Sequence, residues 1–233
     1  MKLKLFLLLF ATFIAFTIIG TLTHELGHYG AAKYLGLTPI LHYQSVTLEL
    51  SNNDIELDKI YGLYQEDINA KRDFPAKKRL DEIMEIETKN DFIHTAAGPI
   101  QTMLTGMIGF ILILIYRKRY FQSAVLNWKQ WLLIFFSLFW LREIFNTAMA
   151  LATLIFTKEK EFYGDEFILS QYLSLGNFGF PIITAIIGLI ISCIVVFKFV
   201  PSSQRKIFIG AGFVGGIMGY ILWMYILGPR LLP

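Results

Sequence analysis

Long apolar runs alternate with shorter polar segments along this chain. The first run, Leu3 to Leu22, is long enough at ~1.5 Å per helical residue to cross a ~30 Å hydrocarbon core, and its helical pattern continues to about Tyr34. Four further apolar runs follow it. The pattern therefore predicts an all-α polytopic membrane protein with about five transmembrane helices, at about 3–34, 92–116, 128–156, 178–200 and 207–227.

A polar insert, residues 35–91, separates the first two predicted spans. Residues 41–50 alternate between two faces and precede a turn, so we expect a strand there and a return strand at 55–64. Residues 76–89 belong to a densely charged stretch and predict a surface helix, whose charges we interpret as a solvated face. The insert is thus expected to be a small β-hairpin and helical segment. The apolar side of that surface helix holds Leu80, Ile83 and Ile86.

Small residues recur at four-residue spacing in two of the predicted spans. Such faces let helices approach closely, so we expect both spans to be packing helices. The second span carries Gly98, Thr102 and Gly106, and the fifth carries the pairs Gly212/Gly216 and Gly215/Gly219.

Composition supports a membrane protein. Of the 233 residues, 55% are hydrophobic, and the mean hydropathy is +0.54, which is too apolar for an ordinary soluble domain. We therefore expect one membrane domain, 1–233, in contact with the lipid bilayer. The net charge of +3 comes from basic residues beside apolar runs, so we expect no nucleic-acid partner. Cys193 is the only cysteine, which excludes an intrachain disulfide.

The N-terminus also fits a second interpretation. Lys2 and Lys4 precede an apolar run, as in a secretory signal peptide. The sequence lacks a clear small-x-small cleavage site, and the helical pattern continues beyond the run. Both observations favour a membrane helix.

The sequence H-E-x-x-H stands at the end of the first long apolar run, inside the predicted helix. His24 and His28 are four residues apart and share a helix face, where two imidazoles can bind a zinc ion. Glu25 can reach a water molecule on that metal. Ionisable groups in a membrane helix are costly and mark candidate functional sites. The alternative is that the two histidines reach the membrane interface or satisfy each other.

Further polar and helix-perturbing residues fall at the same end of the predicted bundle. If the spans alternate in direction, Gly98 and Pro99 open the second span on the side where the two histidines lie. Asn146 falls in the half of the third span nearest that side, and Asp165 follows the third span there. The topology therefore predicts one shallow layer that contains all of these residues.

A catalytic zinc usually has three protein ligands and one open position. Asp165 is the first candidate for the third ligand, although an aspartate there can instead cap a helix over 166–175. Glu143 is a rival ligand, but the adjacent Arg142 favours a charge pair inside the bundle. His94 is a second rival and equally fits a position beside the metal ligands.

At this point the residues resemble the site-2 protease family of intramembrane zinc metalloproteases, in particular its small members without a PDZ domain. The resemblance rests on the run H-E-L-G-H-Y-G-A-A from His24, on A-G-P-I at 97–100, and on Gly164 beside Asp165. Two departures are visible. Thr102 stands where the family usually has asparagine, and here the glycine precedes the aspartate.

The resemblance implies one Zn²⁺ per chain, bound by His24, His28 and Asp165, with Glu25 as the general base. It implies a zinc metalloendopeptidase that hydrolyses peptide bonds in or near the transmembrane segments of membrane-anchored protein or peptide substrates. Such activity would serve regulated intramembrane proteolysis or the clearance of signal-peptide remnants.

The resemblance also implies roles for three other residues. Asn146 would donate a hydrogen bond to the developing oxyanion, although a structural amide between helices is an equal alternative. Gly98 and Pro99 would position the substrate by holding the second helix open. The alternatives to the whole assignment are a non-catalytic membrane scaffold that retains the fold and another membrane-bound H-E-x-x-H metalloprotease.

Orientation is predicted in two ways that disagree. Basic residues in short segments favour a cytoplasmic location for the N-terminal side. The resemblance implies instead that the active site opens near the cytoplasmic face of the cell membrane, which we take as the expectation. The sequence predicts no oligomeric state and no particular substrate.

Overall fold

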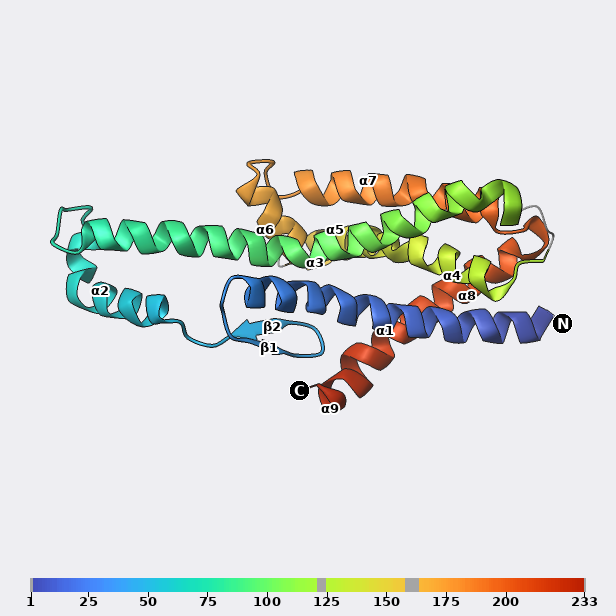
Figure 1. Cartoon of the computed structure of the whole chain (residues 1–233), viewed down its shortest axis with the longest axis horizontal. Helices are drawn as coiled ribbons and strands as arrows, with labels where there is room; N and C mark the ends of the chain where they lie inside the picture. Colours follow the sequence, from blue (N-terminus) through green and yellow to red (C-terminus); the bar gives the residue numbers. More distant parts are fainter. Residues whose placement is uncertain (1, 121–124, 158–163, 233) are drawn as a thin grey trace.

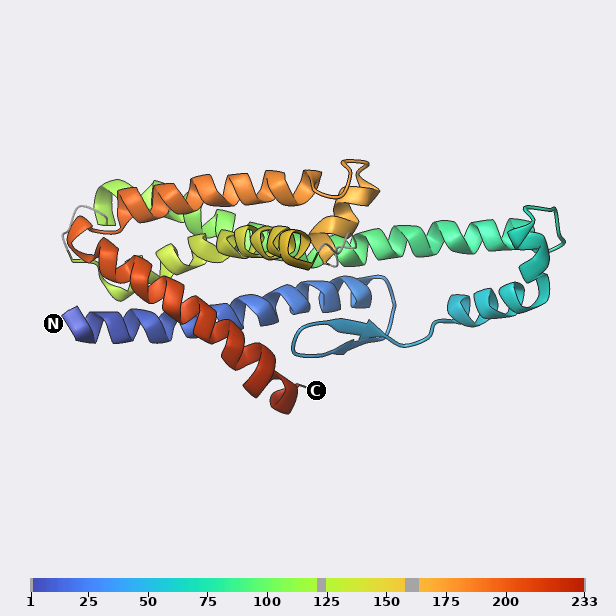
Figure 2. The same ribbon diagram turned by 180° about the vertical axis from the view of Figure 1, so that it is seen from behind.

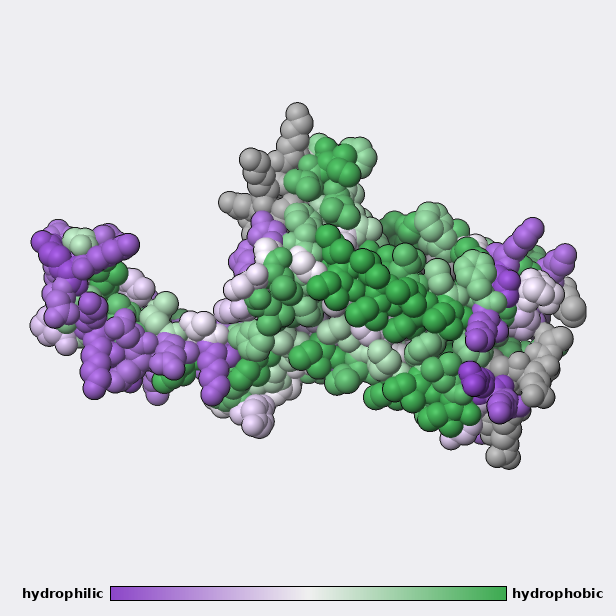
Figure 3. All heavy atoms as spheres, turned by 90° about the horizontal axis from the view of Figure 1, so that it is seen from above, coloured by the Kyte–Doolittle hydropathy of each residue, from purple (hydrophilic) through white to green (hydrophobic). Residues whose placement is uncertain are grey.

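The computed structural model describes residues 2–120, 125–157 and 164–232, and helices dominate them (Figure 1). Five helical segments are long and apolar enough to cross a membrane, which confirms the predicted all-α polytopic class. Their bounds are Lys2–Tyr34, Lys77–Lys118, Trp128–Phe156, Gly179–Phe199 and Ser202–Leu231. Figure 3 shows broad hydrophobic surface over the body of the protein, with hydrophilic residues gathered at its two ends.

The first helix, α1 (Lys2–Tyr34), ends before a two-stranded hairpin. Strand β1 (Pro39–Leu41) pairs antiparallel with β2 (Val46–Leu48), and Ile40 lies opposite Thr47. The predicted return strand at 55–64 is wrong, because that segment lies inside helix α2 (Asn52–Asn69). A reciprocal capping box starts this helix: Ser51 Oγ accepts from the Asp54 amide, and the Asp54 carboxylate accepts from the Ser51 amide.

Helix α3 (Lys77–Tyr120) is 44 residues long and joins the predicted surface helix to the second span without a break. Its first part packs against α2 as a projecting hydrophilic arm, which Figures 1 and 3 show. Leu80 and Ile83 are buried there against Ile60, as the apolar pattern predicted, whereas Ile86 is exposed. The helix is continuous through Pro99, so it is not opened at that point.

The third candidate span consists of three segments. Helix α4 (Trp128–Ser137) passes through a short 3₁₀ turn, η1 (Leu138–Trp140), into α5 (Leu141–Thr157). Helix α5 turns out of the plane of Figure 1, and Figure 2 shows it almost end-on. The third span, predicted at 128–156, is therefore present but bent. Because of this bend, one face of α5 lines the same cavity as the end of α1 that carries the histidines.

Helices α6 to α9 complete the body. Helix α6 (Asp165–Tyr172) precedes α7 (Gly179–Ile194), and the π-helical η2 (Val195–Phe199) ends that span. Helix α8 (Ser202–Ile221) crosses α1 at an angle in Figure 2 and continues through the π-helical η3 (Leu222–Leu227) into α9 (Gly228–Leu231).

The fifth span was predicted to be a packing helix, and the glycines of α8 allow its close approach to α1. A Cβ added at Gly215 would lie 2.8 Å from the Phe10 carbonyl oxygen, and one at Gly219 would lie 2.9 Å from Thr17. A Cβ added at Gly216 would meet nothing within 4 Å, so Gly212 alone serves the packing in the predicted pair Gly212/Gly216. The α1–α8 contact fixes the helix that carries the histidines.

Candidate metal centre

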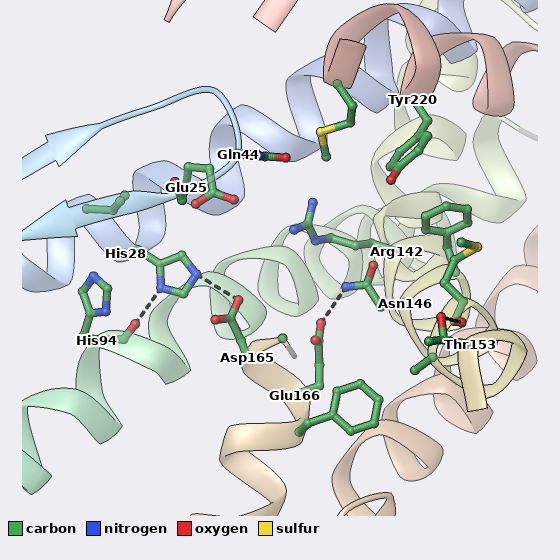
Figure 4. Close-up of a pocket in the computed structure, with 18 residues that line it drawn as sticks. Glu25, His28, Gln44, His94, Arg142, Asn146, Thr153, Asp165, Glu166 and Tyr220 are labelled. Carbon is green, nitrogen blue, oxygen red and sulfur yellow. Dashed lines mark hydrogen bonds and ion pairs between the residues drawn. The ribbon is translucent and has the colours of Figure 1, made fainter. Parts of the chain in front are cut away.

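Three predicted ligands converge at the end of α1. His24 Nε2 lies 2.9 Å and His28 Nε2 lies 3.1 Å from the same carboxylate oxygen, Oδ2 of Asp165, and the two Nε2 atoms are 3.2 Å apart. Both histidines are buried. Figure 4 shows the ring of His28 and the carboxylate of Asp165 pointing toward each other. Among the described residues, these three form the group able to hold a metal ion.

Asp165 reaches this position as the first residue of α6. Gly164 is the N-cap residue, with a φ of 132° that favours glycine, and no side chain caps this helix. The alternative role of Asp165 as the N-cap is therefore wrong. Burial by itself raises the pKa of Asp165, but hydrogen bonds from His24 and His28 outweigh burial and hold the pKa well below its usual range. Asp165 is thus a carboxylate aimed at two imidazoles.

The other end of α6 is fixed to α3. The hydroxyl of Tyr172 donates to the carboxylate of Asp91 over 2.5 Å. Burial together with this carboxylate raises the pKa of Tyr172 to about 12, so the phenol remains a donor throughout the neutral range. This contact helps to place Asp165 relative to α3.

The remaining ring nitrogens are held by α3. His28 Nδ1 donates to the backbone carbonyl of His94 over 2.7 Å, and His24 Nδ1 lies 3.0 Å from the hydroxyl of Thr102. Because Nδ1 of His28 carries the proton, its Nε2 in a neutral ring presents a lone pair to the lone pairs of Asp165. A proton or a metal cation between them removes this repulsion. The tautomer of His28 therefore favours a cation between its Nε2 and Asp165 Oδ2.

Gly98 makes room for both rings. A Cβ there would lie 2.6 Å from His24 Nε2 and 2.7 Å from His28 Cε1, and closer still to His28 Nε2. Pro99 is fully buried beside it. Neither Gly98 nor Pro99 is among the described residues that line the adjoining cavity. The structure thus gives Gly98 a packing role at the imidazoles, and substrate positioning by these two residues stays a prediction.

A cavity of about 570 Å³ opens beside the triad (Figure 4). Glu25 lines it together with His28 and Asp165, although the Glu25 residue is only 4% exposed. The wall continues along one face of α5, from Arg142 and Asn146 to more apolar positions. The lining also includes Gln44 and Ser45 at the hairpin turn, Met149, Ala150 and Thr153 on α5, and Tyr220 and Met224 from the last span.

Asn146 lies in this cavity wall, as the topology predicted, but its amide is engaged. Its Nδ2 donates to Glu166 Oε1 over 2.9 Å, and Figure 4 shows this contact. The hydrogen bond gives Asn146 a structural partner on α6. The second amide hydrogen of Asn146 remains for the predicted hydrogen bond to an oxyanion, and that role stays a prediction.

Neither rival ligand joins the triad. Glu143 is completely buried and lies outside the residues of the cavity wall. The ring of His94 packs against that of His28 in a tilted arrangement, with 5.1 Å between the centroids and 40° between the ring planes, and the contribution of His94 to the centre is its backbone carbonyl. His94 therefore acts beside the ligands, which was the alternative interpretation of this residue.

Two features of the site were not assigned from sequence. Thr102 was noted as a departure from the family pattern, yet its hydroxyl orients His24. Arg142 was read only as a partner of Glu143, yet it lines the cavity. A polar group four residues beyond Gly98 was a readable signal for Thr102, since both then face the same side of the helix.

The donor set fits zinc. Two imidazole nitrogens and a carboxylate oxygen are typical ligands of a catalytic zinc site. Bonds of about 2.0–2.2 Å in tetrahedral geometry place ligand atoms roughly 3.3 Å apart, and the three observed separations are 2.9–3.2 Å. No protein-family model matches the chain, and no curated protein or solved structure matches it either. The site therefore stands on its own geometry.

Proposed function

We propose that the protein is an intramembrane zinc metalloprotease that resembles the site-2 protease family. One observation carries the proposal: His24, His28 and Asp165 converge beside buried Glu25, at the end of an apolar helix long enough to cross a membrane. Zinc held by the three ligands would act as a Lewis acid that polarises a carbonyl group and acidifies water. Every other task falls to residues of the chain.

Glu25 supplies the acid–base chemistry. As a carboxylate in the cavity wall, it accepts a proton from water while the water oxygen adds to the carbonyl carbon of the substrate, and the carbonyl electron pair moves to the oxygen. When the C–N bond breaks, Glu25 delivers that proton to the leaving amine nitrogen. The products are a carboxylic acid and an amine, and Glu25 returns to its starting state.

The shape of the cavity supports a substrate that arrives in extended form from the membrane. A substrate helix must unwind before cleavage, because its carbonyl groups are otherwise hydrogen-bonded within the helix. The cavity provides polar groups at the triad and at the hairpin turn near Gln44, and apolar side chains along α5 toward Met149. A segment that leaves the bilayer would find both environments along one wall.

The experiment compares wild type with Glu25→Gln in membranes of an expression host. Mass spectrometry of the membrane fraction would identify peptide fragments released by each variant. We expect fragments with ends in or near transmembrane segments only with wild type, while both variants bind zinc equally, since glutamine preserves the shape of the side chain. The same fragments at the same abundance from both variants would overturn the proposal.

The orientation in the proposal is the one implied by the resemblance. We propose that the triad opens near the cytoplasmic face of the cell membrane. A reporter fused after residue 233 tests this, because five spans place the C-terminus on the side of the membrane where the triad opens. A reporter active only outside the cytoplasm would overturn the orientation and leave the chemistry unaffected.

A further inference from the structure

We propose that Arg142 binds the carbonyl oxygen of the scissile peptide bond and stabilises it as it becomes an oxyanion. This inference rests on the proposed function and gives it a second catalytic residue. Arg142 belongs to the first turn of α5 and lines the same cavity as Glu25 and Asp165. Figure 4 shows its guanidinium extending into the cavity on the side where Glu25 and Gln44 lie.

No described residue forms a hydrogen bond or an ion pair with the guanidinium of Arg142, and its Nε is buried without a partner. A buried charged donor left without a partner is costly. A guanidinium carries five N–H donors in a planar fork that suits an oxygen with developing negative charge. The cavity therefore contains a donor that a substrate oxygen would satisfy.

Asn146 is less suited to this task. It follows Arg142 by one helical turn on the same wall, but one of its amide hydrogens is already given to Glu166. Asn146 is also neutral, whereas hydrogen bonds from a charged donor are roughly twice as strong as neutral ones. We infer that Asn146 orients Glu166 and leaves the oxyanion to Arg142.

The cavity also indicates which kind of substrate oxygen Arg142 meets. A terminal carboxylate would require the cavity to end at the guanidinium. The wall instead continues from Arg142 along α5 to Met149 and Thr153. A polypeptide that follows this wall passes Arg142 and presents backbone carbonyl groups to it. The arrangement therefore favours cleavage at internal peptide bonds.

A counter-charge for Glu143 is the competing explanation of Arg142. Adjacent residues on a helix do not face each other. Glu143 is completely buried, Arg142 lines the cavity, and the two form no ion pair in the part of the chain that the structure describes. The two explanations differ in what happens when both charges are removed together, which the experiment below uses.

The experiment measures cleavage of a synthetic peptide that spans a site cut by wild type and left intact by Glu25→Gln, with zinc-loaded protein in detergent. Arg142→Gln is expected to lower kcat by about 10²–10³-fold with little change in KM, as for the loss of one oxyanion donor. Arg142→Lys, which keeps a charged donor, is expected to recover part of that loss. Arg79→Gln is the matched control, because Arg79 pairs with Glu56 on the arm and is remote from the cavity.

Inhibitor affinities and a double variant separate catalysis from structure. A phosphinic analogue of the same peptide imitates the tetrahedral oxyanion, so its affinity for the Arg142 variants should fall in parallel with kcat/KM. A hydroxamate of the same peptide, which binds metal without that geometry, should bind them as it binds wild type. The double variant Arg142→Gln/Glu143→Gln should stay as slow as Arg142→Gln alone. Zinc content and thermal unfolding of each variant show that it is folded.

The outcomes distinguish the two proposals. If wild type and Glu25→Gln release the same products, the protease function falls, and the role of Arg142 falls with it. If cleavage depends on Glu25 but Arg142→Gln keeps the wild-type kcat, only the role of Arg142 is overturned. Restored activity in the double variant, or an equal loss of affinity for both inhibitors, would likewise assign Arg142 to charge balance or folding.

Discussion

Gly98→Ala should destroy the metal centre by adding a single methyl group. The new Cβ would lie 2.6 Å from His24 Nε2, whereas ordinary contact begins at 3.4 Å, so this ring alone must retreat by about 0.8 Å. His28 is displaced as well, because the Cβ would also lie 2.7 Å from its Cε1. Ligand distances in a metal site tolerate only about 0.2 Å. The displacement is therefore several times what zinc coordination accepts.

The neighbouring structure cannot absorb this displacement. Both rings are tied back to α3 through Thr102 and the His94 carbonyl, so they cannot leave without losing those contacts. Helix α3 itself is held in close contact further along, since a Cβ at Gly106 would lie 2.5 Å from Trp140. We expect zinc affinity to fall by about 100-fold or more, the upper end of the range for disturbed ligand orientation.

The assay is zinc competition against a chelator of known affinity, on protein purified in detergent, with metal content measured by mass spectrometry. Gly30→Ala is the matched control: it adds the same methyl group to α1 two residues beyond His28, where nothing lies within 4 Å. It should bind zinc as wild type does. Wild-type zinc affinity in Gly98→Ala would refute the reasoning that Gly98 provides the space for both imidazoles.

Two other predictions concern the contacts that place the ligands. Thr102→Val keeps the shape of the side chain but removes the hydroxyl beside His24 Nδ1, and it should lower zinc affinity by about 10- to 100-fold in the same competition assay. Thr102→Ser keeps a hydroxyl and should retain the wild-type zinc affinity. Equal zinc affinities of the two variants would contradict the orienting role of the Thr102 hydroxyl. Tyr172→Phe removes the hydrogen bond to Asp91 and should lower the free energy of unfolding by about 0.5–1.5 kcal/mol, toward the lower value because the side chain is partly exposed. The pKa of Tyr172 in the folded protein is raised to about 12, so the stabilisation by this hydrogen bond is fully present below the ordinary phenol pKa of about 10 and is lost as pH rises through 12. Thermal unfolding from pH 6 to 9 should therefore show a constant stability difference between wild type and Tyr172→Phe. A stability difference that varies across that window would argue against a phenol donor.

Local patterns were sufficient for the spans and for the two histidines. Apolar runs longer than the hydrocarbon core predicted five spans, and the four-residue spacing of His24 and His28 placed both on one face. Asp165 followed from the need for a third ligand and from the alternation of spans. Each of these arguments depends only on periodicity, length or the chemistry of a single residue type.

Pairings between distant segments were beyond such patterns. Thr102, the partner of His24 Nδ1, lies 78 residues away, and Glu166, the partner of Asn146, had no role predicted from the sequence. The 3₁₀ turn that bends the third span between α4 and α5 is Leu138–Trp140, which contains no proline or glycine, so no sequence signal predicts the bend. Tertiary packing decides each of these, and a single sequence does not reveal which surfaces meet.

The error at 55–64 had a readable signal. Ser51 and Asp54 have the spacing of a capping box, with aspartate in place of glutamate, and they begin a helix. The turn composition of the same residues was taken as the link in a hairpin. The strands that do form, β1 and β2, lie just before this point and are only three residues long.

The continuity of α3 has a consequence for how this sequence can vary. His94, Gly98 and Thr102 are spaced four residues apart, so their contributions to the imidazoles form one stripe along the helix. The contribution of His94 is a main-chain oxygen, which any amino acid at that position would supply. Inserting or deleting one residue between 94 and 102 would instead turn part of the stripe away by about 100°, since a helix has 3.6 residues per turn. We therefore expect this segment to accept exchanges of the side chain at position 94, whereas a change in its length would disrupt the centre.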